Sequence, residues 1–444
     1  MYEAINKEKY LLLFFTGLFF LYLLAPTVVD VNQWSRYDLM RALAFDHSIR
    51  IEKYMGNTID WSGPPGHGYF YTNKAPGTSF LGAPFLFIAA KIYGVLRPSI
   101  QDPHYHLLLI TDVFITIIPS VILSLLLYLF IRRQTKEAHP AIITFGYAVA
   151  TIVFKYSAST FGHQTAAVFV FAAFYLLLCS DKLWLSGAFF GLSVLTEYSM
   201  VLLAPGFLLL FFGYKKNDFW SSLLKFCIGG LPAFVIFVWY HKTAFGGYLT
   251  LPMKYNNPLF WGEDERSAVR GVIGYPRPTI LFELLFGQRR GLFLISPVLL
   301  LALIGSVKAV INSTQKELPI FCLWSFTSFL AFNASFNGWH GGNCWGPRYL
   351  VPMLPFLVIG LVWIRHHSKL FYTLLVVSVL NSVAIAAIAV PTGPDDMVYA
   401  GLSSDFGLWP KFILLLTVAS ALFLVAKKVD RDALRKTLSG HSHS

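Results

Sequence analysis

The feature that most constrains this chain is a series of apolar runs, each about as long as a bilayer is thick. A membrane-spanning helix needs about 20 mostly apolar residues. The sequence contains twelve such candidates, near residues 9–28, 106–131, 139–154, 164–180, 183–198, 199–214, 221–241, 291–311, 318–335, 349–365, 369–391 and 409–427. We therefore predict an all-α polytopic membrane protein that forms a single domain over residues 1–444.

Composition supports this class and excludes others. Only 13% of the residues are charged, whereas soluble domains average about 25%. So few charges cannot solvate the surface of a protein this size, which excludes a cytosolic enzyme, a disordered chain and a coiled coil. The net charge of +12 would suggest nucleic acid in a soluble protein, but here it raises the question of membrane sidedness, and we expect no nucleic-acid partner.

One further apolar stretch, 79–97, is interrupted by Gly82, Pro84 and Lys91. Its clean apolar part is roughly 11 residues long, which suits an interfacial or re-entrant helix rather than a span. If this stretch does not cross and the N-terminus is cytoplasmic, every short inside loop is basic, as the positive-inside rule requires. We therefore predict twelve spans with both termini inside, and Glu197 with Tyr198 forming almost the whole turn between two of them.

This topology places the long polar segments outside the cell, at 29–105, 242–290, 336–348 and 392–408. The inside loops are too short for a nucleotide-binding domain, and no GxxxxGK[ST] or GxGxxG motif is present at a strand-to-helix junction. We expect chemistry on the outer face, with a substrate that is lipid-borne or already exported.

The first outer loop mixes carboxylates with cations. Asp30, Glu52 and Asp60 are candidate bases, and Arg36 is a candidate phosphate ligand. The alternative is a solvated loop held by salt bridges.

Lys74 is the strongest candidate for a functional residue in this loop. It lies between an aromatic run that includes Tyr71 and the turn Pro76-Gly77, where a lipid phosphate would rest. Snorkelling to the interface is the alternative explanation of such a lysine. His67 and Tyr71 are candidate substrate contacts in the same segment.

The fifth outer loop, 336–348, holds four glycines together with Trp339, His340, Trp345 and Arg348. Tryptophan faces stack on sugars, and arginine grips phosphate with two N–H groups. An interfacial aromatic belt with a tight turn is the alternative. A divalent metal on His340 and Cys344 is a weaker option, because a zinc site takes three or four protein ligands.

Three further residues are candidates because they lie at the expected outer rim. His163 begins one span, and Glu197 lies at the next outer turn. Ionisable residues at membrane depth are functional candidates by default, although a packed histidine is an equal alternative for His163. Arg290 follows Arg289 directly before a span, against the positive-inside trend, which indicates a bound anion. Asp395 and Asp396 form a carboxylate pair in the last outer loop, but a turn of Pro and Asp residues explains them well enough.

These segments resemble the GT-C class of membrane glycosyltransferases, in the branch of protein O-mannosyltransferases and lipid A aminoarabinose transferases. Lys74-Ala75-Pro76-Gly77 loosely matches that branch's Lys-Pro-Pro-like motif. Three other segments are similar to those of bacterial members, namely Asn32-x-x-Ser35-Arg36, Leu285-Phe-Gly-x-x-Arg290-Gly-Leu292 and Gly341-Gly-x-x-x-Gly-Pro-Arg348-Tyr.

The resemblance implies a polyprenyl-phosphate sugar donor, an Asp base in the first outer loop and a Lys or Arg on the donor phosphate. The branch usually has Asp-Glu before the Arg-Tyr pair, whereas Gln33-Trp34 precede Ser35-Arg36-Tyr37 here. The base must therefore be another carboxylate, of which Asp30 is nearest to that position and Asp60 nearest to Lys74.

The resulting prediction is an inverting glycosyltransferase in the bacterial inner or plasma membrane, with its active site on the extracytoplasmic side. The acceptor would be a lipid, glycan or protein hydroxyl, and no cofactor is certain. The alternatives are a transporter or flippase of a lipid-linked sugar, which predicts ionisable residues near mid-membrane between internal repeats, and an assembly protein without donor chemistry.

Overall fold

The computed structural model describes residues 2–25, 30–66, 68–96, 104–134, 139–260, 273–342, 344–364, 368–387 and 405–439. The α-helices are α1 (Tyr2–Leu23), α2 (Val31–Phe45), α3 (Gly77–Leu96), α4 (His104–Asp112), α5 (Ile118–Gln134), α6 (Pro140–Val149), α7 (Val153–Tyr156), α8 (His163–Cys179), α9 (Leu183–Thr196), α10 (Ala204–Tyr214), α11 (Phe219–Phe245), α12 (Pro278–Phe286), α13 (Leu292–Ile295), α14 (Val298–Asn312), α15 (Glu317–Ser335), α16 (Leu354–Ile359), α17 (Lys369–Ala387) and α18 (Asp405–Ser439).

Short tighter or wider helical turns join several of these helices. A π-helical turn, η2 (Val113–Ile117), connects α4 to α5. The 3₁₀ turns are η1 (Met55–Asn57), η3 (Tyr198–Leu203), η4 (Lys216–Asp218), η5 (Pro252–Tyr255), η6 (Pro258–Phe260), η7 (Arg348–Met353) and η8 (Gly360–Trp363). Two-residue strands β1 (Trp61–Ser62) and β2 (Tyr71–Thr72) pair antiparallel.

The predicted all-α polytopic membrane class is confirmed. Within the described residues, each of the twelve predicted spans overlaps helical structure. Among the described residues, five helices are long and apolar enough to cross a membrane, at His106–Gln134, Lys216–Phe245, Glu317–Ser335, Lys369–Ala387 and Trp409–Asp432. Several others are shorter apolar helices, so the count of twelve crossings stays a prediction. As expected, Glu197 alone separates α9 from η3.

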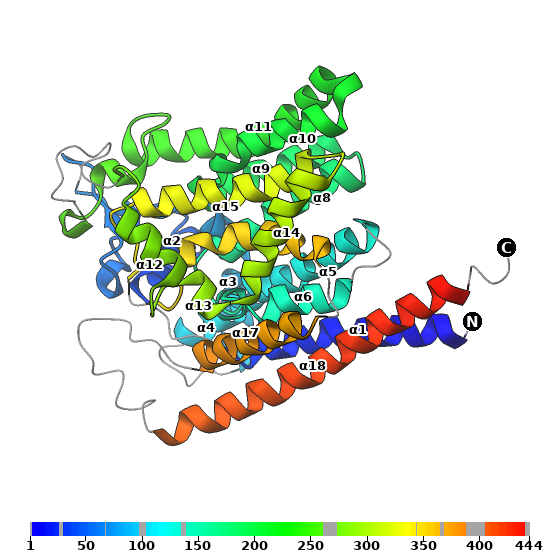
Figure 1. Cartoon of the computed structure of the whole chain (residues 1–444). Coiled ribbons are helices and arrows are strands. Elements are labelled where there is room, and N and C mark those ends of the chain that lie inside the picture. The colour runs from blue at the N-terminus through cyan, green and yellow to red at the C-terminus, as the bar shows by residue number, and fades with distance from the viewer. Residues whose placement is uncertain are drawn as a thin grey trace.

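The helices form a bundle in which both chain ends lie at the same end (Figure 1). Helix α1 runs beside α18 in the opposite direction (Figure 1), and the Lys428 ammonium lies 5.7 Å from the Tyr10 ring centroid. Near that end, Asp430 of α18 accepts hydrogen bonds from the backbone N–H groups of Ala141 and Ile142. These N–H groups begin α6 and have no partner within their own helix, so the last helix caps the first turn of another one.

Small residues let some helices approach to backbone contact. A Cβ atom on Gly187 of α9 would lie 1.8 Å from the Phe226 carbonyl oxygen of α11, and one on Gly229 of α11 would lie 1.7 Å from the Trp184 carbonyl oxygen. Helices in lipid gain van der Waals contact in this way because the hydrophobic effect does not hold them together. Helices α9 and α11 are thus one packed pair.

The segment between α1 and α4 is folded against the end of the bundle opposite the termini (Figure 1). It contains α3, which covers the stretch expected to form an interfacial or re-entrant helix, together with α2 and the β1–β2 hairpin, which was not expected. Helix α3 continues through Pro84 without a break and is not among the five candidate spans. Ser79 Oγ of α3 donates to the Arg36 carbonyl of α2, at 2.8 Å, which ties the two helices together.

Candidate functional site: a buried cluster of ion pairs

Six charged side chains and one histidine from five parts of the chain meet at the end of the bundle where the α1–α4 segment lies. They form three ion pairs, between Arg36 and Glu197 (2.6 Å), Lys74 and Asp60 (2.9 Å), and Arg348 and Asp30 (3.8 Å), with His163 at 3.4 Å from Glu197. We call these seven residues the ionic cluster. All of them were singled out from the sequence.

The N-terminal turns of α2 supply two members of the cluster. Asp30 is the N-cap, and one of its oxygens accepts from the backbone N–H groups of Asn32 and Gln33 at 2.9 and 3.0 Å. The Gln33 side chain accepts from the Asp30 N–H in return, which completes a capping box. Arg36 lies a turn further on, where its Nη1 donates to the Asn32 carbonyl at 3.2 Å and also to the Asn32 side chain. The Asn32-x-x-Ser35-Arg36 motif is therefore a local device that orients Arg36.

The β1–β2 hairpin supplies Asp60 and Lys74. Ser35 Oγ of α2 donates to the Asp60 carbonyl at 2.5 Å and lies 2.6 Å from Thr72 Oγ1. The Lys74 N–H donates to the same Thr72 hydroxyl at 3.1 Å. Asn73 Nδ2 donates to Asp60 Oδ1 at 3.3 Å. The hairpin thus holds Lys74 and Asp60 at one place against α2.

Helices α8 and α9 supply His163 and Glu197 from their adjacent ends. Helix α8 begins at His163 and α9 ends at Thr196, next to Glu197. Gly162 has φ +83°, and a Cβ atom there would lie 2.5 Å from Glu197 Oε1 and 3.0 Å from Arg36 Nε. Only glycine leaves room for the Arg36–Glu197 pair at this point, and it also adopts this backbone conformation without strain.

The fifth loop supplies Arg348. Its guanidinium carbon lies 4.9 Å from the Phe161 ring centroid and 5.1 Å from that of Tyr349, and its Nη2 donates to the Tyr349 hydroxyl at 3.3 Å. A Cβ atom on Gly341, where φ is +66°, would lie 2.9 Å from Arg348 Nε. Each arginine of the cluster therefore lies against a glycine with positive φ.

The cluster is buried, but some of its arginine N–H groups and one histidine ring nitrogen have no hydrogen-bond partner among the described residues. Arg36 and Arg348 are only 2% and 5% exposed. Among the described residues, no hydrogen-bond partner lies within reach of Arg36 Nε, Arg348 Nε, Arg348 Nη1 or His163 Nε2. A buried donor without a partner costs free energy and calls for an explanation. An anion that accepts from these groups would provide it.

The carboxylates of the cluster differ in their affinity for protons. Burial raises the pKa of Asp30, and the charge of Arg348 only partly opposes this effect. Burial would also raise the pKa of Asp60, but Lys74 holds it below its ordinary value. Burial lowers the pKa of Lys74 itself, against the opposing effect of Asp60. Asp30 therefore binds a proton more readily than Asp60, and Asp60 serves as the counter-ion of Lys74.

Arg290 does not join the cluster through any described contact. Its guanidinium donates to the carbonyls of Gly342, Cys344 and Gly346 and to Cys344 Sγ, all in the loop before Arg348. The Gly346 N–H also donates to the Arg289 carbonyl, at 3.1 Å. The two segments that the sequence singled out separately, around Arg290 and around Gly341, thus form one unit. Arg290 organises the loop that carries Arg348 rather than reaching towards the cluster.

The remaining sequence candidates lie beside the cluster or outside it. Tyr71 points into an apolar group with its ring 5.6 Å from that of Phe245. Burial raises the pKa of its phenol, and the charge of Glu52 adds to this rise. No described contact joins Glu52 to the ionic cluster. His67, Asp395 and Asp396 lie outside the described residues.

The other candidates of the fifth loop, Trp339, His340 and Trp345, are more exposed than Arg348. Trp345 accepts through its carbonyl from the Tyr156 hydroxyl at 3.0 Å, and His340 Nδ1 accepts from the Gly342 N–H at 3.0 Å. The Cys344 thiol donates to the Gly341 carbonyl at 3.0 Å. Among the described residues no group of three or more His, Cys, Asp or Glu side chains is placed to hold a metal ion.

Sequence reasoning missed the neutral residues that build the site. Asn32, Ser35, Thr72, Asn73 and Gly162 carry no charge and belong to no long-known catalytic pattern. The sequence pointed to only two of these residues, and only indirectly, since Asn32 and Ser35 lie in a segment that carries the resemblance to the GT-C class. Gly162 offered no signal, because its role depends on Arg36 and Glu197 meeting beside it.

No protein-family model matches the chain, and no curated protein is significantly similar to it in sequence. Solved structures do match. The apo form of ArnT from Cupriavidus metallidurans is 13% identical with a TM-score of 0.53, and the alignment covers 96% of this chain and 74% of that one. The same protein bound to undecaprenyl phosphate gives 12% identity and a TM-score of 0.50 over 97% and 78% of the two chains.

An archaeal oligosaccharyltransferase from Archaeoglobus fulgidus, in the apo form, is 12% identical with a TM-score of 0.51. The match covers 96% of this chain but only 56% of that one, so this chain spans about half of its length. Both neighbours are GT-C glycosyltransferases. The chain is therefore an integral membrane protein with the GT-C fold, as its sequence segments had suggested. At this identity the likeness concerns the fold alone.

Proposed function

We propose that this protein is a glycosyltransferase that takes a sugar from a polyprenyl-phosphate donor and passes it to an acceptor hydroxyl on the extracytoplasmic side. The observation that carries the proposal is the set of buried arginine N–H groups without partners, next to Lys74 and two carboxylates. The neighbour that binds undecaprenyl phosphate supports the same class of donor.

In the proposed complex the donor phosphate lies among Arg36, Lys74 and Arg348. An arginine side chain suits this role because its planar N–H groups match phosphate oxygens in pairs. Lys74 would exchange part of its contact with Asp60 for the phosphate. The polyprenyl tail would follow the apolar outer face of α3, where Phe87, Ile88 and Ile92 are exposed.

The proposed reaction is a single displacement. The acceptor oxygen bonds to the anomeric carbon while the bond from that carbon to the phosphate oxygen breaks, and the bonding electron pair leaves with the phosphate. The acceptor proton passes to Asp30, whose second oxygen is not used in capping α2. The fixed cations stabilise the charge that grows on the phosphate in the transition state. This route inverts the anomeric centre, which product stereochemistry can check.

The direct test uses purified protein in detergent with a radiolabelled undecaprenyl-phosphate sugar and a membrane extract as the acceptor source. An enzyme releases undecaprenyl phosphate without a sealed compartment, whereas a transporter or flippase leaves the donor intact. We expect Lys74→Ala to lower the rate by on the order of 10²–10³, the loss typical of removing one group that stabilises transition-state charge.

Lys53→Ala is the matched control. Lys53 lies in the same segment and pairs with Asp46 at 2.6 Å, but it is far more exposed than Lys74. We expect this variant to retain its rate. An intact donor with the unchanged protein, or a Lys74→Ala variant as active as Lys53→Ala, would count against the proposal.

A further inference from the structure

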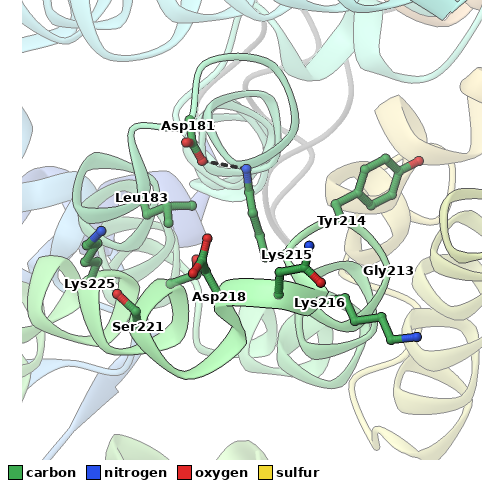
Figure 2. Close-up of a pocket in the computed structure, with 11 residues that line it drawn as sticks. Asp181, Leu183, Gly213, Tyr214, Lys215, Lys216, Asp218, Ser221 and Lys225 are labelled. Carbon is green, nitrogen blue, oxygen red and sulfur yellow. Dashed lines mark hydrogen bonds and ion pairs between the residues drawn. The ribbon is translucent and has the colours of Figure 1, made fainter.

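A polar cavity lies at the end of helices α8 to α11 that is far from the ionic cluster. It has a volume of about 520 Å³ and lies between the turn that joins α8 to α9 and the turn that joins α10 to α11. Its lining includes Asp181, Lys215, Lys216, Asp218, Ser221 and Lys225 (Figure 2). None of these residues takes part in the proposed reaction.

The distance between the cavity and the cluster follows from helix α8. This helix begins at His163 in the cluster and ends at Cys179, two residues before Asp181. Its 17 residues span about 25 Å at 1.5 Å per residue, close to the roughly 30 Å of a bilayer's hydrocarbon core. With the cluster at one lipid headgroup layer, the cavity therefore lies at the other.

The cavity lining carries three lysines, Lys215, Lys216 and Lys225, and two aspartates, Asp181 and Asp218, so positive side chains outnumber negative ones by one and favour an anion. Lys215 reaches across it to Asp181, at 2.5 Å (Figure 2). Within the described parts of the chain, Lys216 and Lys225 have no carboxylate within ion-pair distance, and both are exposed. Ser221 and Ser222 add hydroxyl donors to the lining. Two ammonium groups and two hydroxyl groups can together hold a phosphate.

The surface around the cavity faces lipid. Trp184 is 60% exposed and Trp220 is 78% exposed, and exposed tryptophans at helix ends are typical of the membrane interface. Below them, α11 presents an exposed apolar stripe made of Leu224, Ile228, Leu231 and Val235. Their spacing of three or four residues places these side chains on one face of the helix, which begins at the cavity and leads towards the membrane centre.

We propose that this cavity binds the headgroup of an anionic phospholipid, whose acyl chains lie along the exposed stripe of α11. The phosphate contacts Lys216, Lys225 and the two serines, while Lys215 and Asp181 hold the two turns together. Basic pockets between helices are known binding places for anionic headgroups. A zwitterionic lipid fits less well, because its ammonium group would approach the same lysines.

The experiment uses the full chain in nanodiscs that contain phosphatidylglycerol and phosphatidylcholine, with retained lipids counted by native mass spectrometry. We expect the unchanged protein to retain phosphatidylglycerol in preference to phosphatidylcholine. The double variant Lys216→Gln/Lys225→Gln should lose that preference by on the order of 20- to 30-fold, about fivefold for each lysine near an anionic surface.

The matched control is Lys308→Gln/Lys316→Gln. It removes two exposed lysines, Lys308 near the C-terminus of α14 and Lys316 directly before α15. Both lie at the same end of the bundle as the cavity but do not line it. We expect the preference to survive in this variant. Equal retention of both lipids by the unchanged protein, or an equal loss in the two double variants, would overturn the proposal.

A third arm separates a lipid from a free anion. Inorganic phosphate or glycerol phosphate at millimolar concentration should not displace the retained lipid, because neither has chains to lie along α11. Displacement by either would show a site for soluble phosphate and overturn the lipid assignment. No arm measures sugar transfer, so its outcome does not depend on the proposed enzyme activity.

Discussion

Arg36 and Arg348 are the single residues on which the proposed anion site depends most. Both guanidinium groups are buried, and the Nε of each lies against a glycine in the left-handed region, Gly162 or Gly341. A side chain at either glycine would fill the space beside these N–H groups.

The substitution Gly162→Ala tests this geometry. The added methyl group would contact Glu197 Oε1 and Arg36 Nε, so the pair must move apart. We expect transfer to fall by on the order of 10- to 100-fold, the loss typical of a reacting group displaced by about 1 Å. Labelled-donor turnover measures it.

Gly246→Ala is the control for backbone strain. Gly246 has a similar φ of +77°, but a Cβ atom there would meet nothing within 4 Å. Both substitutions carry the cost of a left-handed alanine, roughly 1–2 kcal/mol, and only Gly162→Ala disturbs the ion pair. Equal activity in the two variants would show that the space beside Gly162 is not needed for transfer.

The proposed base, Asp30, determines how the transfer rate should depend on pH. As the base it must be unprotonated, so the rate falls as the pH drops through its pKa. Burial raises that pKa, so the acid side of the rate profile lies at higher pH than for an ordinary aspartate. The negative charge of Asp60 adds to the rise.

The variant Asp60→Asn should therefore move the acid side of the profile to lower pH, in addition to lowering the rate through Lys74. Asp30→Asn should remove the base and nearly all turnover. A complete loss of activity in Asp60→Asn together with a substantial residual rate in Asp30→Asn would assign the base to Asp60 instead. The rate of labelled-donor consumption, measured from about pH 3 to about pH 9 so that the range includes the ordinary aspartate pKa of about 3.9 and neutral pH, decides between them.

At the scale of an element, the π-helical turn η2 has a specific stabilising partner. A π turn interrupts the regular i to i+4 ladder, and the Thr165 hydroxyl of α8 donates to the Ile115 carbonyl within η2, at 2.8 Å. Thr165 and Ile115 are both buried. The turn therefore depends on a neighbouring helix for one of its backbone hydrogen bonds.

We expect Thr165→Val to destabilise the protein by about 1–3 kcal/mol, the cost of a buried polar group left without a partner. Thr165→Ser keeps the hydroxyl group and should lose much less. Thermal unfolding in detergent, followed by the loss of monodisperse protein, measures both. Identical transition temperatures for the two variants would mean that this hydrogen bond contributes nothing to stability.

For the whole molecule, the distribution of charge follows the two ends of the bundle. The ion pairs of the cluster lie at one end, whereas the contacts of Arg133 with the Cys179 carbonyl, Lys215 with Asp181 and Lys428 with Tyr10 lie at the other. Charged groups gather at helix ends because a charge within the hydrocarbon core is costly. This separation agrees with an even number of crossings and with both termini at one end (Figure 1).

Cysteine labelling tests the membrane topology. We expect Tyr248→Cys, beyond the end of α11 near the cluster, to react with a membrane-impermeant maleimide added to whole cells. Asn217→Cys, in the turn before α11, should react only after the membrane is opened. Both variants need Cys227→Ser, because Cys227 is an exposed cysteine. Labelling of both positions from the same side would contradict a single crossing by α11.

The sequence by itself determined that this protein lies in a membrane, where its long apolar helices are and which charged residues are candidates for the site. Hydropathy and helical periodicity depend on residues that are close together in the sequence, so they can be read from the sequence without the tertiary structure. Only the tertiary structure decided which charges meet. Arg36 and Glu197 are 161 positions apart, and their contact depends on α2, α8 and α9 ending at one place. The same packing turned Arg290 towards loop carbonyls and Arg348 towards Asp30, because no local pattern records which of two arginines has unused N–H groups.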